Sequence, residues 1–156
     1  MESLRIERKD IYTIEVNDKG ETIEFDLVDV ELPFKCEKAW AEVNKISKEL
    51  QAQLVIISKQ EDTKQKGKLL TMKEEKTLDA YRKAFKEMRV AMDGFLGESA
   101  CQKIFGDRNY LEMFNDLFDS LKPHLEKIAL RISPFWGMTA MGWIFSAVFC
   151  NVTISQ

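Results

Sequence analysis

The sequence predicts a mainly α-helical bundle that opens with an N-terminal β-hairpin, a fold at the margin of the α+β class. Three observations lead to this prediction: an alternating apolar pattern near the N-terminus, apolar residues at steps of three and four over most of the chain, and a length of 156 residues, which suits one domain. We expect that single domain over residues 1–131. Its expected elements are a hairpin at 11–28 and helices at about 34–57, 70–96, 99–105 and 109–131.

The expected hairpin consists of two β-branched and apolar runs, Ile11–Val16 and Glu21–Val28. The segment Asn17–Gly20 between them has the residues of a tight turn, in which Gly20 can adopt a positive φ. Two strands alone are marginally stable in water, so their apolar face must pack on the helices or on another chain. Alternation places these residues on that face: Tyr12, Ile14, Val16, Ile23, Phe25 and Leu27.

The first helical pattern follows Pro33 and begins at about Phe34. Its apolar positions recur at steps of three and four, with Lys and Glu between them. These positions are Cys36, Trp40, Val43, Ile46, Leu50, Leu54 and Ile57. Residues 58–68 contain no apolar side chain, which is typical of a solvated connector or of the polar end of a helical arm.

Two later helices carry matched apolar stripes, each with alternating steps of three and four. The first stripe is Leu78, Tyr81, Phe85, Met88, Met92 and Phe95. The second is Leu111, Phe114, Phe118, Leu121, Leu125 and Ile128. Because the stripes have nearly equal length, we expect the two helices to pack antiparallel and to form each other's core, in preference to an intermolecular coiled coil.

A short helix at 99–105, with Ser99 as its expected N-cap, and a turn at 106–109 connect the two striped helices. Charged residues of both signs lie between the apolar positions of the first striped helix, and we expect them on a solvated face. They are Lys86, Glu87, Arg89 and Asp93.

The charged residues all lie at or before Arg131, so the last 25 residues carry no charge. The formal net charge is −3, which argues against a general nucleic-acid binder. We interpret residues 132–156 as a hydrophobic segment that docks in a groove or an oligomer interface. A membrane anchor is the alternative, although the uncharged run 135–150 is shorter than the roughly 20 residues of a spanning helix. Aromatic residues are common anchors of interfaces, and the candidate partner-binding residues are Phe135, Trp136, Trp143, Phe145 and Phe149.

We expect no catalytic, cofactor-binding or metal site. His124 is the only histidine, and a lone histidine without neighbouring ligands does not make a zinc site. The sequence contains neither a GxxxxGK[ST] nor a GxGxxG phosphate-binding motif. The widely spaced Cys36, Cys101 and Cys150 are typical of reduced thiols in a cytosolic protein.

One segment carries a family resemblance. It reads Phe95-Leu-Gly-Glu-Ser-Ala-Cys-Gln-Lys-Ile-Phe-Gly-Asp-Arg-Asn109. Together with the strand Thr22–Leu27 and the Lys/Glu-rich helices, it resembles tail assembly chaperones of long-tailed, siphovirus-type phages and prophages of Gram-positive bacteria. In those proteins a helix ending in Phe-hydrophobic-Gly precedes a short helix closing in Phe-Gly, a polar turn and a terminal amphipathic helix. The resemblance covers about residues 12–131, and its matching positions are Phe95, Gly97, Ile104, Phe105, Gly106 and Asn109.

The resemblance implies a non-catalytic assembly factor in the cytoplasm of the bacterial host. Such a protein binds the tape measure protein, helps to recruit the major tail protein into the tail tube, and needs no cofactor. A charged body with apolar stripes also suits the covering of another protein's apolar helix face. We expect a homo-oligomer. Two other functions remain open: a small tail-anchored membrane protein with a cytosolic helical domain, and a homo-oligomeric structural subunit of the virion.

Overall fold

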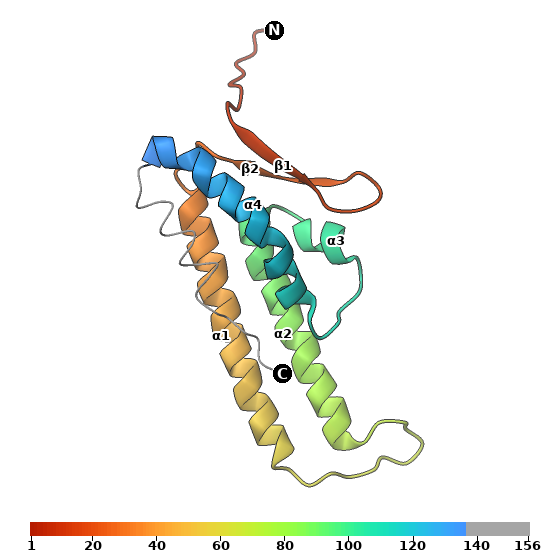
Figure 1. The fold of residues 1–156 in the computed structure, drawn as a ribbon. Coiled ribbons are helices and arrows are strands. Elements are labelled where there is room, and N and C mark those ends of the chain that lie inside the picture. Colours follow the sequence, from red (N-terminus) through yellow and green to blue (C-terminus); the bar gives the residue numbers. More distant parts are fainter. Residues whose placement is uncertain (137–156) are drawn as a thin grey trace.

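The computed structural model describes residues 1–136, with side chains placed through Arg131. The predicted class, mainly α with an N-terminal β-hairpin, is confirmed (Figure 1). In chain order the elements are β1 (Ile11–Glu15), β2 (Thr22–Asp26), α1 (Leu32–Ser58), α2 (Met72–Leu96), α3 (Ala100–Phe105) and α4 (Met113–Trp136).

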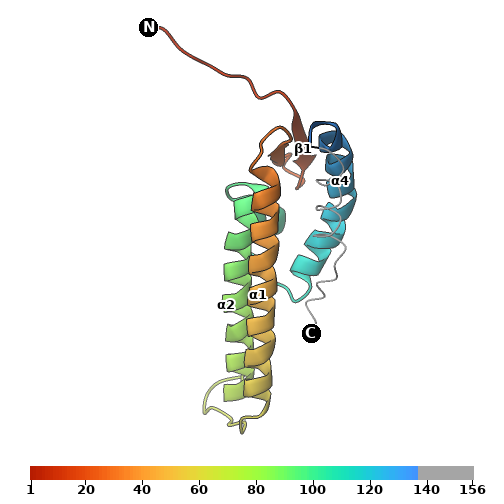
Figure 2. The same cartoon turned by 90° about the vertical axis from the view of Figure 1, so that its left-hand side faces the viewer.

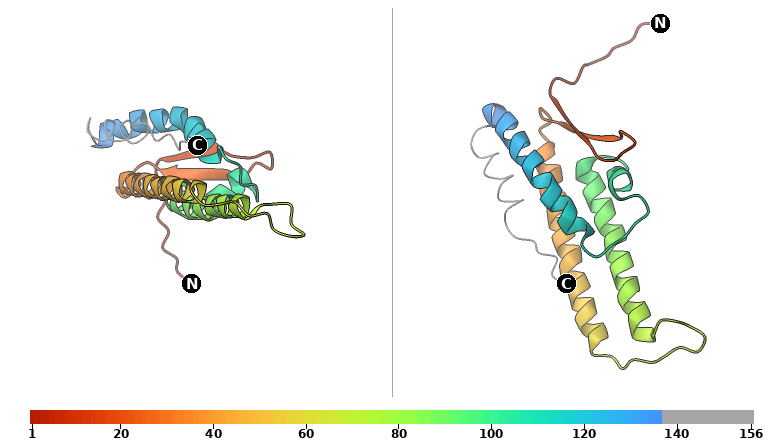
Figure 3. Two further views of the ribbon diagram at one scale, coloured as in Figure 1. Left: turned by 90° about the horizontal axis from the view of Figure 1, so that it is seen from below. Right: turned by 45° about the vertical axis from the view of Figure 1, so that its right-hand side comes forward.

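The helices form two layers. Helices α1 and α2 lie side by side as a long antiparallel pair, and the solvated connector predicted after residue 57 joins their distal ends. Helix α4 and the β-hairpin form the second layer, on one side of this pair (Figures 2 and 3). Helix α4 covers the half of the pair that lies nearer the hairpin and leaves the distal half without a helix above it.

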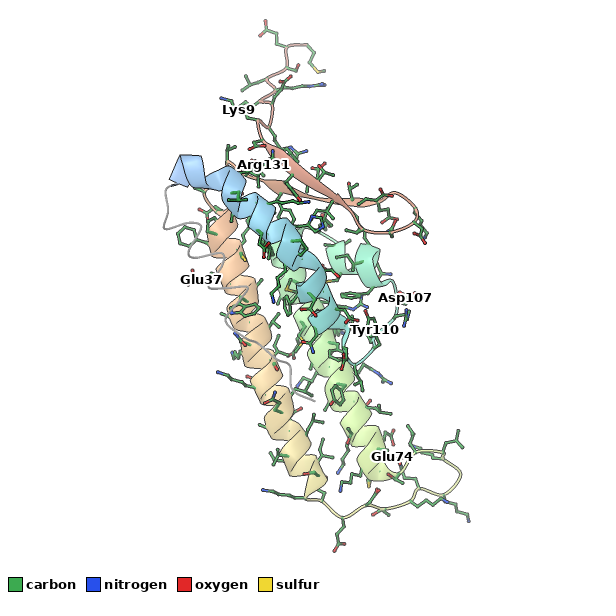
Figure 4. All side chains as sticks on the ribbon, viewed as in Figure 1. Lys9, Glu37, Glu74, Asp107, Tyr110 and Arg131 are labelled. Atoms are coloured by element: carbon green, nitrogen blue, oxygen red, sulfur yellow. The ribbon has the colours of Figure 1, made fainter. Side chains whose placement is uncertain are left out.

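The two long helices begin with recognisable signals. Pro33 lies in the first turn of α1, where a missing N–H has no cost, so α1 begins two residues before the expected Phe34. Helix α2 begins with a capping box. The Thr71 hydroxyl accepts the Glu74 N–H at 3.2 Å, and the Glu74 carboxylate accepts the Thr71 N–H at 3.0 Å. Figure 4 marks Glu74 at this distal end.

The β-hairpin packs its predicted apolar face onto the helices. Tyr12 pairs with Phe25 and Ile14 with Ile23 in the antiparallel register. The β2 side of this face is buried, and the β1 side is half-buried against the same core. The ring centroid of Phe25 lies 5.2 Å from that of Phe95 at the end of α2. The chain's own helices therefore supply the partner that an isolated hairpin lacks.

The predicted antiparallel packing of α2 and α4 is wrong, because the two helices run in the same direction. Phe114 at the start of α4 contacts Phe85 in the middle of α2, with ring centroids 5.7 Å apart. Further along both helices, Leu121 and Phe95 line one common cavity. The reason lies in the connection: α3 and the turn after Gly106 carry the chain back along α2 before α4 begins.

Most of the predicted core stripe is buried. Tyr81 and Phe118 are half-buried. Leu78 and Leu111 are exceptions, because their exposed fractions are 48% and 50%. Leu111 precedes Met113, the first residue of α4. Leu78 is uncovered because α4 begins beside Phe85, seven residues further along α2 than Leu78. The fully buried members are Phe85, Met88, Met92, Phe95, Phe114, Leu121, Leu125 and Ile128.

The boundaries of α3 and α4 also differ from the expectation. Helix α4 begins at Met113 and continues to Trp136, which is five residues into the uncharged segment. Helix α3 begins at Ala100, but Ser99 does not cap it: Ser99 has a φ of 59° and its side chain makes no capping hydrogen bond. Instead, the Asp93 carboxylate of α2 accepts the Cys101 N–H at 2.8 Å, so a neighbouring helix satisfies the first turn of α3.

Candidate interaction surface

The face of the α1–α2 pair that points away from α4 carries an open groove with a volume of about 950 Å³. Figure 2 shows no other helix or strand on this side of the pair, and the N-terminal segment before β1 extends past its upper end. The groove extends along α1 from Lys35 to Glu49, which corresponds to about 20 Å, or about four helical turns. Its floor contains small and apolar residues: Ala39, Ile46, Val90, Ala91 and Gly94.

The rim of the groove is charged, with an excess of positive charge in a chain whose net charge is −3. Its eight charged side chains are all exposed. Lys35 lies 3.5 Å from the Asp29 carboxylate, whereas the other four lysines make no ion pair or hydrogen bond with another residue of the described part. The rim consists of Lys35, Lys38, Lys45, Lys83, Lys86, Glu42, Glu49 and Glu87.

The opposite face of the pair is closed by α4. The ring centroids of Trp40 on α1 and Phe118 on α4 lie 5.4 Å apart in a T-shaped contact. The cavity beside them, which α1, α2 and α4 share, has a volume of about 30 Å³. That is about the volume of one water molecule and far below the roughly 300 Å³ of a small-molecule pocket. This inner cavity is therefore a packing seam and not a ligand site.

The single histidine joins the hairpin to α4. The Tyr12 hydroxyl oxygen lies 2.9 Å from Nδ1 of His124. The Arg131 guanidinium lies 5.5 Å from the Tyr12 ring centroid and binds the Asp10 carboxylate. Figure 4 marks Arg131 on α4. Partial burial, with a contribution from Lys127, lowers the pKa of His124. A neutral imidazole that accepts the Tyr12 O–H at Nδ1 fits this arrangement.

The described part of the chain contains neither a cluster of metal ligands nor an activated thiol. No group of three or more His, Cys, Asp or Glu side chains there is placed to hold a metal ion. Cys36 and Cys101 are free and buried. Burial raises the pKa of each thiol to about 12, with a contribution from Glu37 and Asp93 respectively. Both thiols therefore stay protonated near neutral pH, where only a thiolate is a good nucleophile. Cys150 lies outside the described residues.

The segment that carries the family resemblance forms the junction between α2, α3 and α4. Phe105 at the end of α3 packs on Phe114, with ring centroids 5.8 Å apart. Gly97 ends α2 with a φ of 115°, and Gly106 ends α3 with a φ of 64°. Side chains with a Cβ rarely adopt these values, so both reversals favour glycine. These residues therefore fix the path by which the chain returns toward α4.

Arg89 holds this junction together. Its guanidinium donates to the Gly106 carbonyl at 3.0 Å, to the Arg108 carbonyl at 2.6 Å and to Asn109 Oδ1 at 3.1 Å. It also lies 5.5 Å from the ring centroid of Phe105. Three donors of one planar group thus fix three groups of one turn, which a lysine ammonium cannot reproduce.

The prediction of a solvated face was wrong for Arg89 and Asp93, which are half-buried and bind the α3 region. Lys86 and Glu87 are exposed as expected, and both line the groove. One signal in the sequence favours a buried position for Arg89, because it follows the core residue Phe85 by four residues. The spacing does not separate Asp93 from Lys86: the two lie seven residues apart and so close to one side of α2, and only the contact with α3 distinguishes Asp93.

The candidate partner-binding aromatic residues lie at or beyond the end of the described part. Phe135 and Trp136 belong to the last turn of α4, but the structure does not describe their side chains. Trp143, Phe145 and Phe149 lie outside the described residues altogether. Among the helices of residues 1–136, none combines the length and the apolar character that crossing a membrane requires.

Comparison with known proteins identifies one family. Its sequence model, described as a family of unknown function (DUF6673), matches residues 19–135. The matched region contains β2, the helices α1, α2 and α3, and all of α4 except its last residue, and it therefore includes both the groove and the α2–α3–α4 junction. Neither a curated protein nor a solved structure matches the chain.

Proposed function

The chain belongs to the DUF6673 family, whose function is unknown, and we propose that it is a non-catalytic tail assembly chaperone of long-tailed phages or prophages. In this proposal it acts in the cytoplasm of the bacterial host, binds the tape measure protein and helps to recruit tail tube subunits. The sequence resemblance at Phe95–Asn109 supports the class of protein.

The groove on the α1–α2 pair is the observation that carries the proposal. A helix of a partner with one apolar face fits a groove that has an apolar floor, a charged rim and a length of about four turns. Val90 in the floor has an exposed fraction of 70%, which leaves apolar surface available for such a contact.

Co-expression with the tape measure protein from the same locus tests the proposal. A long helical protein with an apolar stripe aggregates when that stripe meets water, and we expect this chain to increase its soluble fraction. The two proteins should also elute together in size-exclusion chromatography. Equal solubility of the tape measure protein with and without this chain would refute the proposal.

The composition of purified particles separates the chaperone from a structural subunit. A chaperone leaves before the tail is complete, so we expect this chain in lysates of induced cells but not in purified virions. Detection of the chain at a fixed ratio to the major tail protein in purified particles would instead identify a structural subunit.

A further inference from the structure

We propose that the groove between α1 and α2 binds an amphipathic helix whose flanks are acidic. This inference rests on the proposed function and names the surface and the chemistry of the partner. The occupant is a helix of another protein, with its apolar face on the groove floor and Asp or Glu residues on both sides of that face.

The charge of the rim carries the choice of an acidic partner. Five lysines and three glutamates surround the floor, although acidic residues outnumber basic ones in the whole chain. Lys38 and Lys45 on α1 and Lys83 and Lys86 on α2 have no carboxylate partner in the described part of the chain. Glu42, Glu49 and Glu87 also make no ion pair in the described part, so four unpaired lysines face three unpaired glutamates, and the remaining excess of charge is positive. This excess favours carboxylates on the partner.

The floor of the groove permits close approach of a helix. Ala39 on α1 and Ala91 on α2 are small, and Gly94 lies inside α2, where glycine is less favourable for the helix than alanine. A Cβ added at Gly94 would meet no atom within 4 Å. The fold of this chain therefore does not require a glycine at this position, and the space above Gly94 belongs to the groove.

The uncharged segment 137–156 of this chain is a less suitable occupant, because it has no Asp or Glu side chain for the lysine rim. A second copy of the chain is the other alternative. The experiment below distinguishes each of these from an acidic helix of a partner.

Two synthetic peptides of about 18 residues, or five helical turns, test the inference with the full chain. Both carry the same apolar stripe, and the flanking positions are Glu in one peptide and Lys in the other. Fluorescence anisotropy at low salt should show about tenfold tighter binding of the Glu peptide, because several exposed ion pairs each make a small favourable contribution. The difference should shrink as salt screens the charges.

Variants at Gly94 test the location. Gly94→Trp fills the groove and should abolish binding of the Glu peptide, whereas the matched control Gly94→Ala should bind it like the wild type. Circular dichroism and thermal melting establish that both variants are folded. Val90→Glu, which places a carboxylate at an exposed floor position, gives an independent test and should weaken binding of the Glu peptide.

A charge swap tests the chemistry. The double variant Lys38→Glu/Lys86→Glu converts a rim of five lysines and three glutamates into one of three lysines and five glutamates. It should prefer the Lys peptide. Equal binding of both peptides by the wild type, or unchanged binding by Gly94→Trp, would overturn the inference.

Light scattering and a truncated chain separate the other occupants. A wild-type dimer that Gly94→Trp converts to a monomer would assign the groove to a second copy and overturn the inference. A chain ending at Trp136 that binds the Glu peptide much more tightly than the full chain would assign the groove to residues 137–156. Because the peptides need no tape measure protein, the groove and the proposed function fail or succeed separately.

Discussion

The hydroxyl oxygen of Tyr12 lies 2.9 Å from Nδ1 of His124, a contact that joins the β-hairpin to α4 across 112 positions of the sequence. It is one of few polar contacts between the two ends of the described chain. Beside this contact, the Arg131 guanidinium lies over the Tyr12 ring and forms an ion pair with the Asp10 carboxylate. The docking of the hairpin on α4 therefore depends on polar as well as apolar contacts.

Tyr12→Phe removes only the hydroxyl group from this contact. We expect the free energy of unfolding to fall by about 1 kcal/mol, the usual net contribution of one hydrogen bond. Urea denaturation followed by circular dichroism measures the change. Tyr81→Phe is the matched control, because the Tyr81 hydroxyl makes no hydrogen bond with another described residue, and its effect should stay within about 0.5 kcal/mol. Equal effects of the two changes would contradict a role for the Tyr12–His124 contact.

Stability should fall on mild acidification because of His124. Its pKa in the folded state is lowered from the ordinary value of 6.5, so the unfolded chain binds more protons on this histidine than the folded chain does. The contribution of His124 is therefore complete above about pH 6.5 and is lost as the pH falls through the lower folded-state pKa. The charged side chains of Lys127, Arg131 and Asp10 lie around this contact. The effect of His124 alone is therefore the difference in pH dependence between the wild type and a variant that lacks this histidine.

The suitable comparison is His124→Gln, which keeps an acceptor for the Tyr12 hydroxyl and does not titrate. Urea denaturation of both proteins between about pH 7.5 and pH 5, a window from about one unit above the ordinary histidine pKa to about one and a half units below it, should give a shallower decline for His124→Gln. Parallel curves would show that protonation of His124 is not coupled to folding.

The hairpin and the helices could be predicted from the sequence because both depend on local periodicity. Alternation in Ile11–Glu15 and Thr22–Asp26 reports which side of a strand is buried, and steps of three and four in α2 report one side of a helix. Stripe positions such as Phe85 and Phe114 are accordingly buried. The capping box at Thr71 also lies within four consecutive residues.

The direction of α4 could not be predicted in this way, because contacts between distant residues determine it. Arg89 of α2 binds the turn at 106–109, and Asp93, also of α2, accepts a hydrogen bond from the first turn of α3. The candidate groove was missed for a similar reason. Lys38 and Lys86 appear in the sequence as ordinary solvated positions, and only the antiparallel pairing of α1 and α2 brings them to one groove.

Arg89→Lys should destabilise the junction between α3 and α4. The variant keeps the positive charge but loses the planar group that donates to Gly106, Arg108 and Asn109. We expect a loss of about 1–3 kcal/mol in the free energy of unfolding, measured by urea denaturation. Arg82→Lys, in the same helix but with a side chain 76% exposed, is the matched control and should change stability little. A loss no larger than that of the control would rule out Arg89 as the clamp of this turn.

Removal of residues 137–156 should lower the oligomeric state of the protein. This segment is uncharged and contains Trp143, Phe145 and Phe149, which are large apolar side chains of the kind that anchor interfaces. Helix α4 extends to Trp136, so a chain ending there keeps all described elements intact. Light scattering should give a smaller mass for the truncated chain, and thermal melting should show that it is still folded. The expectation rests on the general tendency of large apolar side chains to be buried between copies when water would otherwise contact them. The same mass for both chains would mean that any self-association uses another surface.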